Sequence, residues 1–200
     1  MPAPDGTVPL DNVAARFARA CRRAEVDHLF VGGFAVVAWG QPRTTSDIDT
    51  LLRYGEEDVA RLVGALADED LETSTRDLRA ALTDGSHVSV FTEDPILTVD
   101  IKPALDASEV EQIQDGVEVQ LDEGPVSVAP PADTVVFKVL FGSEQDLQDA
   151  RSILARQGDR LDRERLGALA SRHGVGDEVD QILAEVEAAL EEDGGSPTGR

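Results

Sequence analysis

The stretch LFVGGFAV at Leu29–Val36 is followed along the chain by the tripeptide Asp47-Ile48-Asp49. The first stretch combines a short apolar strand, a Gly32-Gly33 turn and the start of a helix. Residues two apart on a strand project to the same side, so we expect Asp47 and Asp49 to lie together. Neighbouring carboxylates repel each other, and a hard divalent cation with oxygen ligands, such as Mg²⁺, offsets that repulsion.

Each of these features has a plainer interpretation when it is taken alone. A glycine pair is commonly a simple turn, and two aspartates at a strand end can be a solvated edge that discourages aggregation. At a helix start, however, free backbone N–H groups bind phosphate. A third carboxylate, Asp100, lies in the apolar strand segment Val99-Asp100-Ile101, where a lone charge is costly to bury. Three carboxylates on one sheet are what a two-metal phosphoryl-transfer site requires.

The front of the chain resembles the nucleotidyltransferase superfamily, whose fold is that of DNA polymerase beta. The resemblance lies in VGGFA at Val31–Ala35, in Gly40, in RTT at Arg43–Thr45 and in SDID at Ser46–Asp49. This spacing is most similar to the bacterial and archaeal branch of abortive-infection and toxin–antitoxin minimal nucleotidyltransferases. The segments DTVVFK at Asp133–Lys138 and QDLQDA at Gln145–Ala150 resemble the lysine helix and the following acidic helix of that branch.

The resemblance implies roles for the front motif. Gly32 and Gly33 would contact a triphosphate through the backbone. Asp47 and Asp49 would hold Mg²⁺, and Asp100 would share the second metal ion and help to deprotonate the acceptor hydroxyl. These three aspartates are therefore the expected catalytic and metal-binding residues.

The resemblance also implies further substrate-binding residues. Arg43 and Thr45 belong to the front motif, Lys138 would face the phosphates, and Asp146 would orient Lys138 or help to build the pocket. The implied reaction transfers a nucleoside monophosphate from an NTP to an acceptor hydroxyl on a protein, a tRNA or a small molecule. The implied setting is a toxin–antitoxin or phage-defence system with a cognate partner protein.

Two departures from the family pattern favour an alternative function. Many relatives carry a serine after the first glycine, whereas here Gly33 is followed by Phe34. Related chains also often carry an arginine just before the acidic helix, where this chain has Ser143-Glu144. The alternative is a non-catalytic interaction module, an antitoxin or regulator that keeps the nucleotidyltransferase fold to bind a partner.

The fold expected from the whole pattern is α/β (α+β). A small mixed β-sheet flanked by helices would form a core over residues 1–129. A C-terminal helical bundle would follow over 130–192, and a disordered tail rich in Gly, Ser and Pro would occupy 193–200. Within the core, the turns Glu93–Pro95 and Asp122–Gly124 predict two hairpins.

The chain is strongly acidic, with 40 acidic residues against 18 basic ones and a net charge of −22. Only Lys102 and Lys138 among the basic residues are lysines. Such a surface is typical of a halophilic protein, because high salt screens the self-repulsion. Ordinary solubility in a GC-rich genome is the alternative. The same charge argues against a broad nucleic-acid-binding face.

Other features of the sequence indicate a cytoplasmic protein. Residues 1–6 show no signal peptide, and no stretch approaches the roughly 20 apolar residues of a membrane span. The single cysteine, Cys21, is expected in the core. The three histidines are scattered through the sequence, so we expect structural or exposed roles for them.

Overall fold

The computed structural model describes residues 10–42 and 44–194, which form two compact units. The first unit takes residues 10–34 and 44–129, and the second takes 35–42 and 130–194. The division falls within helix α2 (Gly32–Trp39). None of the described helices is long and apolar enough to cross a membrane. Residues 1–6 and the tail from 195 onwards lie outside the described part.

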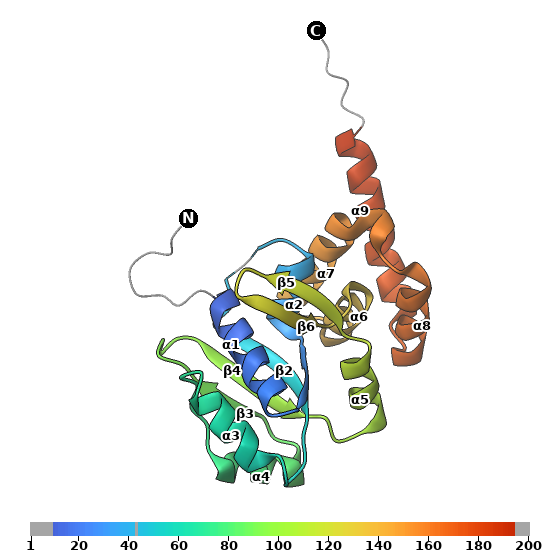
Figure 1. Cartoon of the computed structure of the whole chain (residues 1–200). Coiled ribbons are helices and arrows are strands. Elements are labelled where there is room, and N and C mark those ends of the chain that lie inside the picture. Colours follow the sequence, from blue (N-terminus) through green and yellow to red (C-terminus); the bar gives the residue numbers. More distant parts are fainter. Residues whose placement is uncertain (1–9, 43, 195–200) are drawn as a thin grey trace. The chain divides into compact units, whose positions relative to one another are not determined.

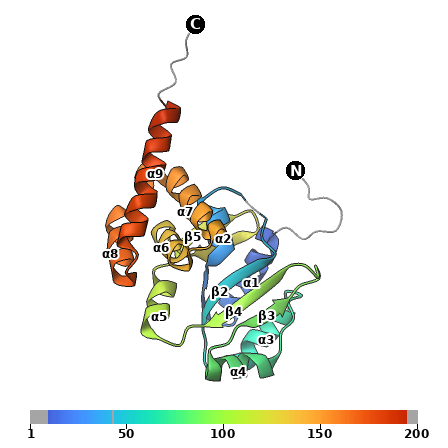
Figure 2. The ribbon, with the colours of Figure 1, turned by 180° about the vertical axis from the view of Figure 1, so that it is seen from behind.

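The first unit is built on one six-stranded mixed sheet. Its strands are β1 (Asp27–Phe30), β2 (Asp47–Arg53), β3 (Val88–Phe91), β4 (Thr98–Pro103), β5 (Val117–Leu121) and β6 (Gly124–Val128). They lie in the order β3-β4-β2-β1-β6-β5. The two predicted hairpins, β3–β4 and β5–β6, are antiparallel. The central strands pair across long stretches of chain, β2 parallel to β4 and β1 parallel to β6. Figure 2 shows β2 and β4 side by side.

Four helices of the first unit pack around this sheet. They are α1 (Leu10–Arg23), α3 (Val59–Ala67), α4 (Thr75–Asp84) and α5 (Ala107–Gln114). Helix α1 packs against β1, β6 and α3, and its buried face carries Phe17. Figure 1 shows α1 in front of the sheet. Phe17 meets Phe30 of β1 edge to face, with ring centroids 5.9 Å apart. Helix α5 packs against β1 and β2 instead.

The side chain of Arg16 holds two loops of the first unit in place. It is 8% exposed, and its Nε donates to the carbonyl of Glu69 in the loop after α3 at 2.8 Å. Its Nη1 donates to Glu93 in the β3–β4 turn at 2.6 Å. The hydrogen bond from Arg16 lowers the pKa of the Glu93 carboxyl. The β3–β4 turn is therefore fixed by α1 as well as by its own strands.

The second unit is a helical bundle around its own apolar core. Its helices are α6 (Pro131–Phe141), α7 (Glu144–Gln157), α8 (Arg163–His173) and α9 (Gly176–Gly194), with a 3-10 turn at Gly158–Arg160. Helix α6 packs against the other three helices. The core is made of Val36 from α2 and of aliphatic residues such as Val135, Ile153, Leu166 and Ile182.

Two helices differ from what the sequence predicts. Helix α9 extends to Gly194, past the predicted start of the tail. Helix α5 was not predicted, because Ile113 is its only buried residue and leaves little apolar periodicity.

Candidate active site

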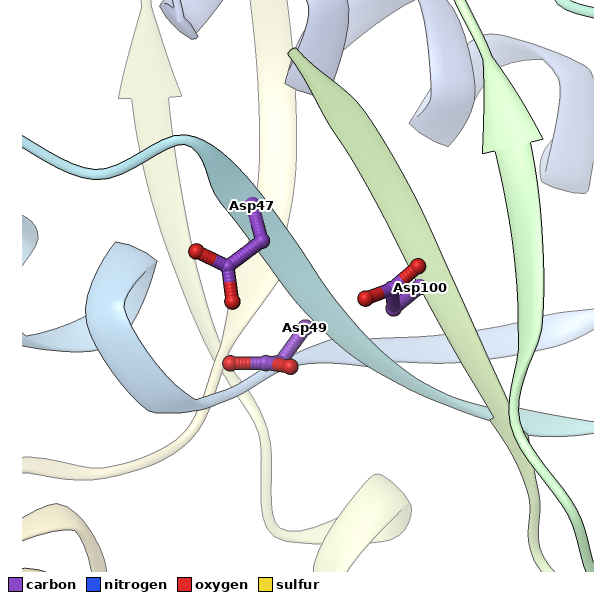
Figure 3. Close-up of side chains that lie close together, drawn as sticks. All are labelled: Asp47, Asp49 and Asp100. Atoms are coloured by element: carbon purple, nitrogen blue, oxygen red, sulfur yellow. The ribbon is translucent and has the colours of Figure 1, made fainter. Parts of the chain in front are cut away.

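The three aspartates singled out in the sequence lie together on one face of the sheet. Strands β2 and β4 run parallel with Asp49 opposite Asp100 and Asp47 opposite Thr98. One carboxylate oxygen from each aspartate lies within 4.8 Å of the other two. Figure 3 shows Asp47 and Asp49 side by side on one strand and Asp100 beside them on the next. The pleat accounts for this, because residues i and i+2 share a face.

These residues fit a hard divalent cation. The donor set is three carboxylates, the ligand type that Mg²⁺ and Ca²⁺ take, and all three side chains are half-buried and therefore accessible. Three like charges this close destabilise one another unless positive charge is supplied. A bound cation would supply it, with Asp47, Asp49 and Asp100 as its protein ligands.

Asp100 is held by its neighbours on both sides. Ser89 lies opposite it on β3, and the Ser89 hydroxyl donates to Oδ1 of Asp100 at 2.7 Å. On the β2 side, Thr50 Oγ1 donates to the Asp100 carbonyl at 3.1 Å. A partner that orients a carboxylate also orients any metal bound to it. Ser89 was not predicted as a site residue, because its position opposite Asp100 depends on the strand register.

Asp47 has hydroxyl neighbours from the residues just before it. Thr45 Oγ1 lies 3.1 Å from the Asp47 carbonyl oxygen and 3.3 Å from its Oδ1. Ser46 Oγ lies 3.4 Å from the same Oδ1. The structure thus places Thr45 beside a candidate metal ligand. Arg43, which the sequence also suggests as a substrate-binding residue, lies outside the described residues.

Gly32 lies directly against Asp49. Its φ is +55°, in the left-handed region that favours glycine, and a Cβ built on it would overlap Oδ2 of Asp49. The preceding residue, Val31, donates its N–H to the Asp49 carbonyl at 2.9 Å. The start of α2, with Gly32 and Gly33, is therefore brought to the carboxylates from the β1 side. Backbone amides at a helix start are suited to bind phosphate.

Lys138 and Asp146 form a buried cluster within the second unit. Lys138 on α6 is 8% exposed, and its Nζ donates to Asp146 Oδ1 at 2.7 Å. The same Nζ lies 3.0 Å from Oδ2 of Asp149, which is 3% exposed. Ser143, the N-cap residue before α7, donates its backbone N–H to Asp146 Oδ2 at 3.3 Å, so Asp146 also takes part in capping the helix.

The electrostatics of this cluster favour an ionised Asp146. Burial opposes ionisation, but hydrogen bonds from Lys138 and Ser143 outweigh it and lower the pKa of Asp146. Asp149 was not predicted as a site residue. The only feature of the sequence that points to Asp149 is its position three residues after Asp146, which places both on the same helix face.

His28 and Cys21 are ionisable side chains buried in the core of the first unit. His28 on β1 packs against Phe17 and Phe30, and burial lowers its pKa to about 4. Cys21 on α1 is fully buried, and burial raises the pKa of its thiol. Both residues are therefore uncharged parts of the core at neutral pH, which agrees with the structural roles expected from the sequence.

Comparison with solved structures identifies the fold. An antigenic nucleotidyltransferase-like protein from Paracoccidioides brasiliensis aligns with a TM-score of 0.53 at 17% identity, over 91% of this chain and 95% of that chain. The chain has the nucleotidyltransferase fold. The antibiotic-resistance factor ANT(2″)-Ia shares this fold, with a TM-score of 0.52 at 15% identity over 86% of this chain and 96% of its own. The fold class predicted from the sequence is thereby confirmed.

A second structure of ANT(2″)-Ia, in complex with adenylyl-2″-tobramycin, aligns with a TM-score of 0.50 at 14% identity, over 90% of this chain and 98% of that chain. No family model matches the sequence, and no curated protein matches it significantly. At these identities the likeness is one of fold. The toxin–antitoxin branch suggested by the motifs stays a prediction.

Proposed function

We propose that this protein is a Mg²⁺-dependent nucleotidyltransferase. It transfers a nucleoside monophosphate from an NTP to an acceptor hydroxyl and releases pyrophosphate. The observation that carries the proposal is the convergence of Asp47, Asp49 and Asp100 on one sheet face beside Gly32. When bound there, Mg²⁺ supplies positive charge that offsets the triphosphate and the charge developing on the attacking and leaving oxygens.

The chain's own residues have distinct tasks in this reaction. Asp47 and Asp49 hold the nucleotide's cation, and the backbone at Gly32 and Gly33 receives the phosphates. The acceptor oxygen forms a bond to the α-phosphorus while the bond from that phosphorus to the pyrophosphate oxygen breaks. Asp100, oriented by Ser89, is placed to accept the proton that the acceptor hydroxyl loses.

The remaining residues of the predicted site help to bind the substrates. Thr45 orients Asp47 through its hydroxyl. Lys138 supplies a cation for the phosphates, and Asp146 and Asp149 hold its ammonium group in one position. Arg43, as part of the same motif, contributes a second cation.

The acceptor is proposed to be a small molecule or a protein rather than a tRNA. The net charge of −22 repels a phosphate backbone, and high salt weakens that repulsion without reversing it. The structure of ANT(2″)-Ia with adenylyl-2″-tobramycin provides a precedent for a small-molecule acceptor on this fold. A protein acceptor is consistent with the toxin–antitoxin setting that the motifs suggest.

A labelled-nucleotide assay tests the proposal. The protein is incubated in molar KCl with each NTP labelled at the α-phosphate, with Mg²⁺ and with the low-mass, protein or RNA fraction of an extract of the source organism. We expect a labelled product in the low-mass or protein fraction, together with pyrophosphate. EDTA and the variant Asp49→Asn should both abolish the product.

The variant Asp122→Asn is the matched control. It makes the same chemical change at an exposed position in the β5–β6 turn and should leave transfer intact. If the wild-type protein neither transfers label nor binds NTP in the presence of Mg²⁺, the non-catalytic module becomes the better explanation of this fold.

A further inference from the structure

We propose that strand β3 forms the acceptor side of the active site and that Phe91 contacts an apolar group of the acceptor. The inference rests on the proposed function and narrows its substrate class. The favoured acceptor carries an aromatic or alicyclic group close to the hydroxyl that receives the nucleotide.

Two rows of residues run across the sheet through the site. In one row, Asp49 on β2 lies opposite Asp100 on β4, and Asp100 lies opposite Ser89 on β3. Residues paired in this way project on the same side of the sheet. The hydrogen bond between the Ser89 and Asp100 side chains agrees with this arrangement.

The adjacent row runs from Asp47 through Thr98 to Phe91. Phe91 therefore shares the face of the three carboxylates. Because strands are spaced by about 4.8 Å, its Cα lies roughly 10 Å across the sheet from that of Asp47. One residue of β4, Thr98, lies between Asp47 and Phe91 in this row.

The strand order places the expected phosphate-binding turn and the proposed acceptor residues on opposite sides of the carboxylates. Gly32 meets Asp49 from the β1 side, whereas Ser89 and Phe91 lie beyond Asp100 on the β3 side. In an in-line displacement, the attacking and leaving oxygens lie on opposite sides of the phosphorus. If the triphosphate is bound at Gly32 and Gly33, the acceptor approaches from the side of β3.

Phe91 is an exposed apolar side chain on a fixed backbone. Its exposed fraction is 59%, and that of Ile96 in the turn that follows is 71%. Glu72 donates its N–H to the Phe91 carbonyl at 2.9 Å, and the Phe91 N–H donates to the Glu72 carbonyl at 2.8 Å. Together with the hydrogen bond from Arg16 to Glu93, these contacts fix the backbone that carries the Phe91 ring.

An exposed aromatic residue on a sheet edge is a liability for aggregation. Single exposed apolar residues are common in proteins. What distinguishes Phe91 is its place in the row that contains Asp47, at the end of the face where its neighbours Thr98, Asp100 and Ser89 are polar. An apolar group of a bound acceptor would cover the ring and remove both apolar surfaces from water.

Competition between two matched alcohols tests the inference. Glycerol and its benzyl ether share a diol and differ by one aromatic group. Each is added as a competitor while the wild-type protein labels the acceptor fraction identified above. We expect the benzyl ether to inhibit at a concentration about tenfold lower than glycerol, as burial of part of a ring predicts.

Three variants test whether the preference for the benzyl ether arises from the Phe91 side chain. In Phe91→Ser the difference between the two alcohols should shrink to within about twofold, and the KM for the acceptor should rise about tenfold while NTP affinity is unchanged. Phe91→Leu, which keeps an apolar surface, should restore most of the difference. Val117→Ser, on the edge strand β5 at the other end of the sheet and 39% exposed, should behave as wild type.

The possible failures are distinguishable. If labelling proceeds but the two alcohols inhibit equally in the wild type, or differ equally in wild type and Phe91→Ser, the inference is wrong and the proposed function stands. If the wild type neither binds NTP nor transfers label, the proposed function is wrong and the inference falls with it.

Discussion

Gly32 leaves open the space that the carboxylate of Asp49 occupies. The backbone of Gly32 is left-handed, and any side chain there would displace Oδ2 of Asp49. The glycine that was expected to bind phosphate is thus also required by the packing of a candidate metal ligand.

The first prediction follows from this contact. Gly32→Ala should cost about 1–2 kcal/mol of stability for its backbone conformation alone, and it should also weaken Mn²⁺ binding because Asp49 has to move. Gly174→Ala is the matched control, with φ of +72° and no atom within 4 Å of the added Cβ. It should lose similar stability and keep metal affinity. Equal Mn²⁺ affinity in the two variants would contradict the prediction.

The second prediction concerns the carboxylates and Ser89. Asp47→Asn and Asp100→Asn should lower Mn²⁺ or Mg²⁺ affinity by about 100-fold or more, and Ser89→Ala by about 10- to 100-fold. In EDTA, the melting temperature of Asp47→Asn and Asp100→Asn should stay equal or rise slightly, because one of three repelling charges is removed.

Calorimetric titration with metal and melting curves in EDTA measure both effects. Ser89→Thr keeps the hydroxyl and should recover most of the affinity. An aspartate variant that melts well below wild type in EDTA would make that carboxylate a structural residue instead.

The third prediction separates stability from substrate binding at Lys138. Lys138→Met leaves Asp146 and Asp149 without their shared cation and should cost about 3–5 kcal/mol. Lys102→Met removes the other lysine of the chain, whose ion pair with Glu109 is more exposed, and should cost no more than about 1 kcal/mol. Urea unfolding measures both changes.

A triple variant completes the test. Adding Asp146→Asn and Asp149→Asn to Lys138→Met removes the unpaired charges and should recover much of the stability. If NTP affinity in the triple variant falls below that of the double variant Asp146→Asn/Asp149→Asn, which keeps the lysine, Lys138 also serves the phosphates. Unchanged affinity would confine Lys138 to the second unit's own stability.

Contacts between residues close together in the sequence could be predicted, whereas contacts between distant segments could not. Both hairpins were predicted, because a turn such as Glu93–Pro95 lies between the strands it joins. The parallel pairing of β2 with β4 was not predicted, since no local signal fixes it. Helix α5 lacked periodicity, yet the capping box of Asp106 and Glu109 was a signal that could have revealed it.

The same distinction holds for the candidate site. Asp47 and Asp49 are two residues apart on one strand, and this local spacing is enough to predict that they share a face. The place of Ser89 depends on the register between β3 and β4, and the contact of Asp149 with Lys138 depends on helix packing, so neither could be identified without the tertiary structure.

The fourth prediction is a loss of stability in mild acid caused by His28. Its native pKa of about 4 lies below its ordinary value of 6.5. Between these values the unfolded chain binds more protons than the native protein, so the free energy of unfolding falls as the pH falls. Between pH 7.5 and 5 the loss should be about 2 kcal/mol.

Replacement of the imidazole tests this. His28→Phe keeps a ring against Phe17 and Phe30 and should remove that part of the pH dependence, whereas His87→Gln, at an exposed position, should keep it. Urea unfolding at the two pH values, in the same KCl concentration, gives the comparison. Equal slopes for wild type and His28→Phe would refute the prediction.

The fifth prediction concerns salt. With a net charge of −22, the melting temperature should rise steeply between about 0.1 M and molar KCl, because the reach of repulsion shortens from about 10 Å to about 3 Å. Differential scanning calorimetry across this range measures it. A melting temperature that is flat or falls with KCl would count against the halophilic interpretation.

The parallel pairing of β2 with β4 also bears on how the protein folds. Asp49 and Asp100 meet only when the chain has closed the long loop that contains α3, α4 and β3, and such non-local pairing is slow to form. A partly folded chain in which β4 has not yet docked holds Asp47 and Asp49 but lacks the third ligand. Full metal affinity therefore reports completion of the central sheet, and rapid-mixing experiments with Mn²⁺ would time that step during refolding.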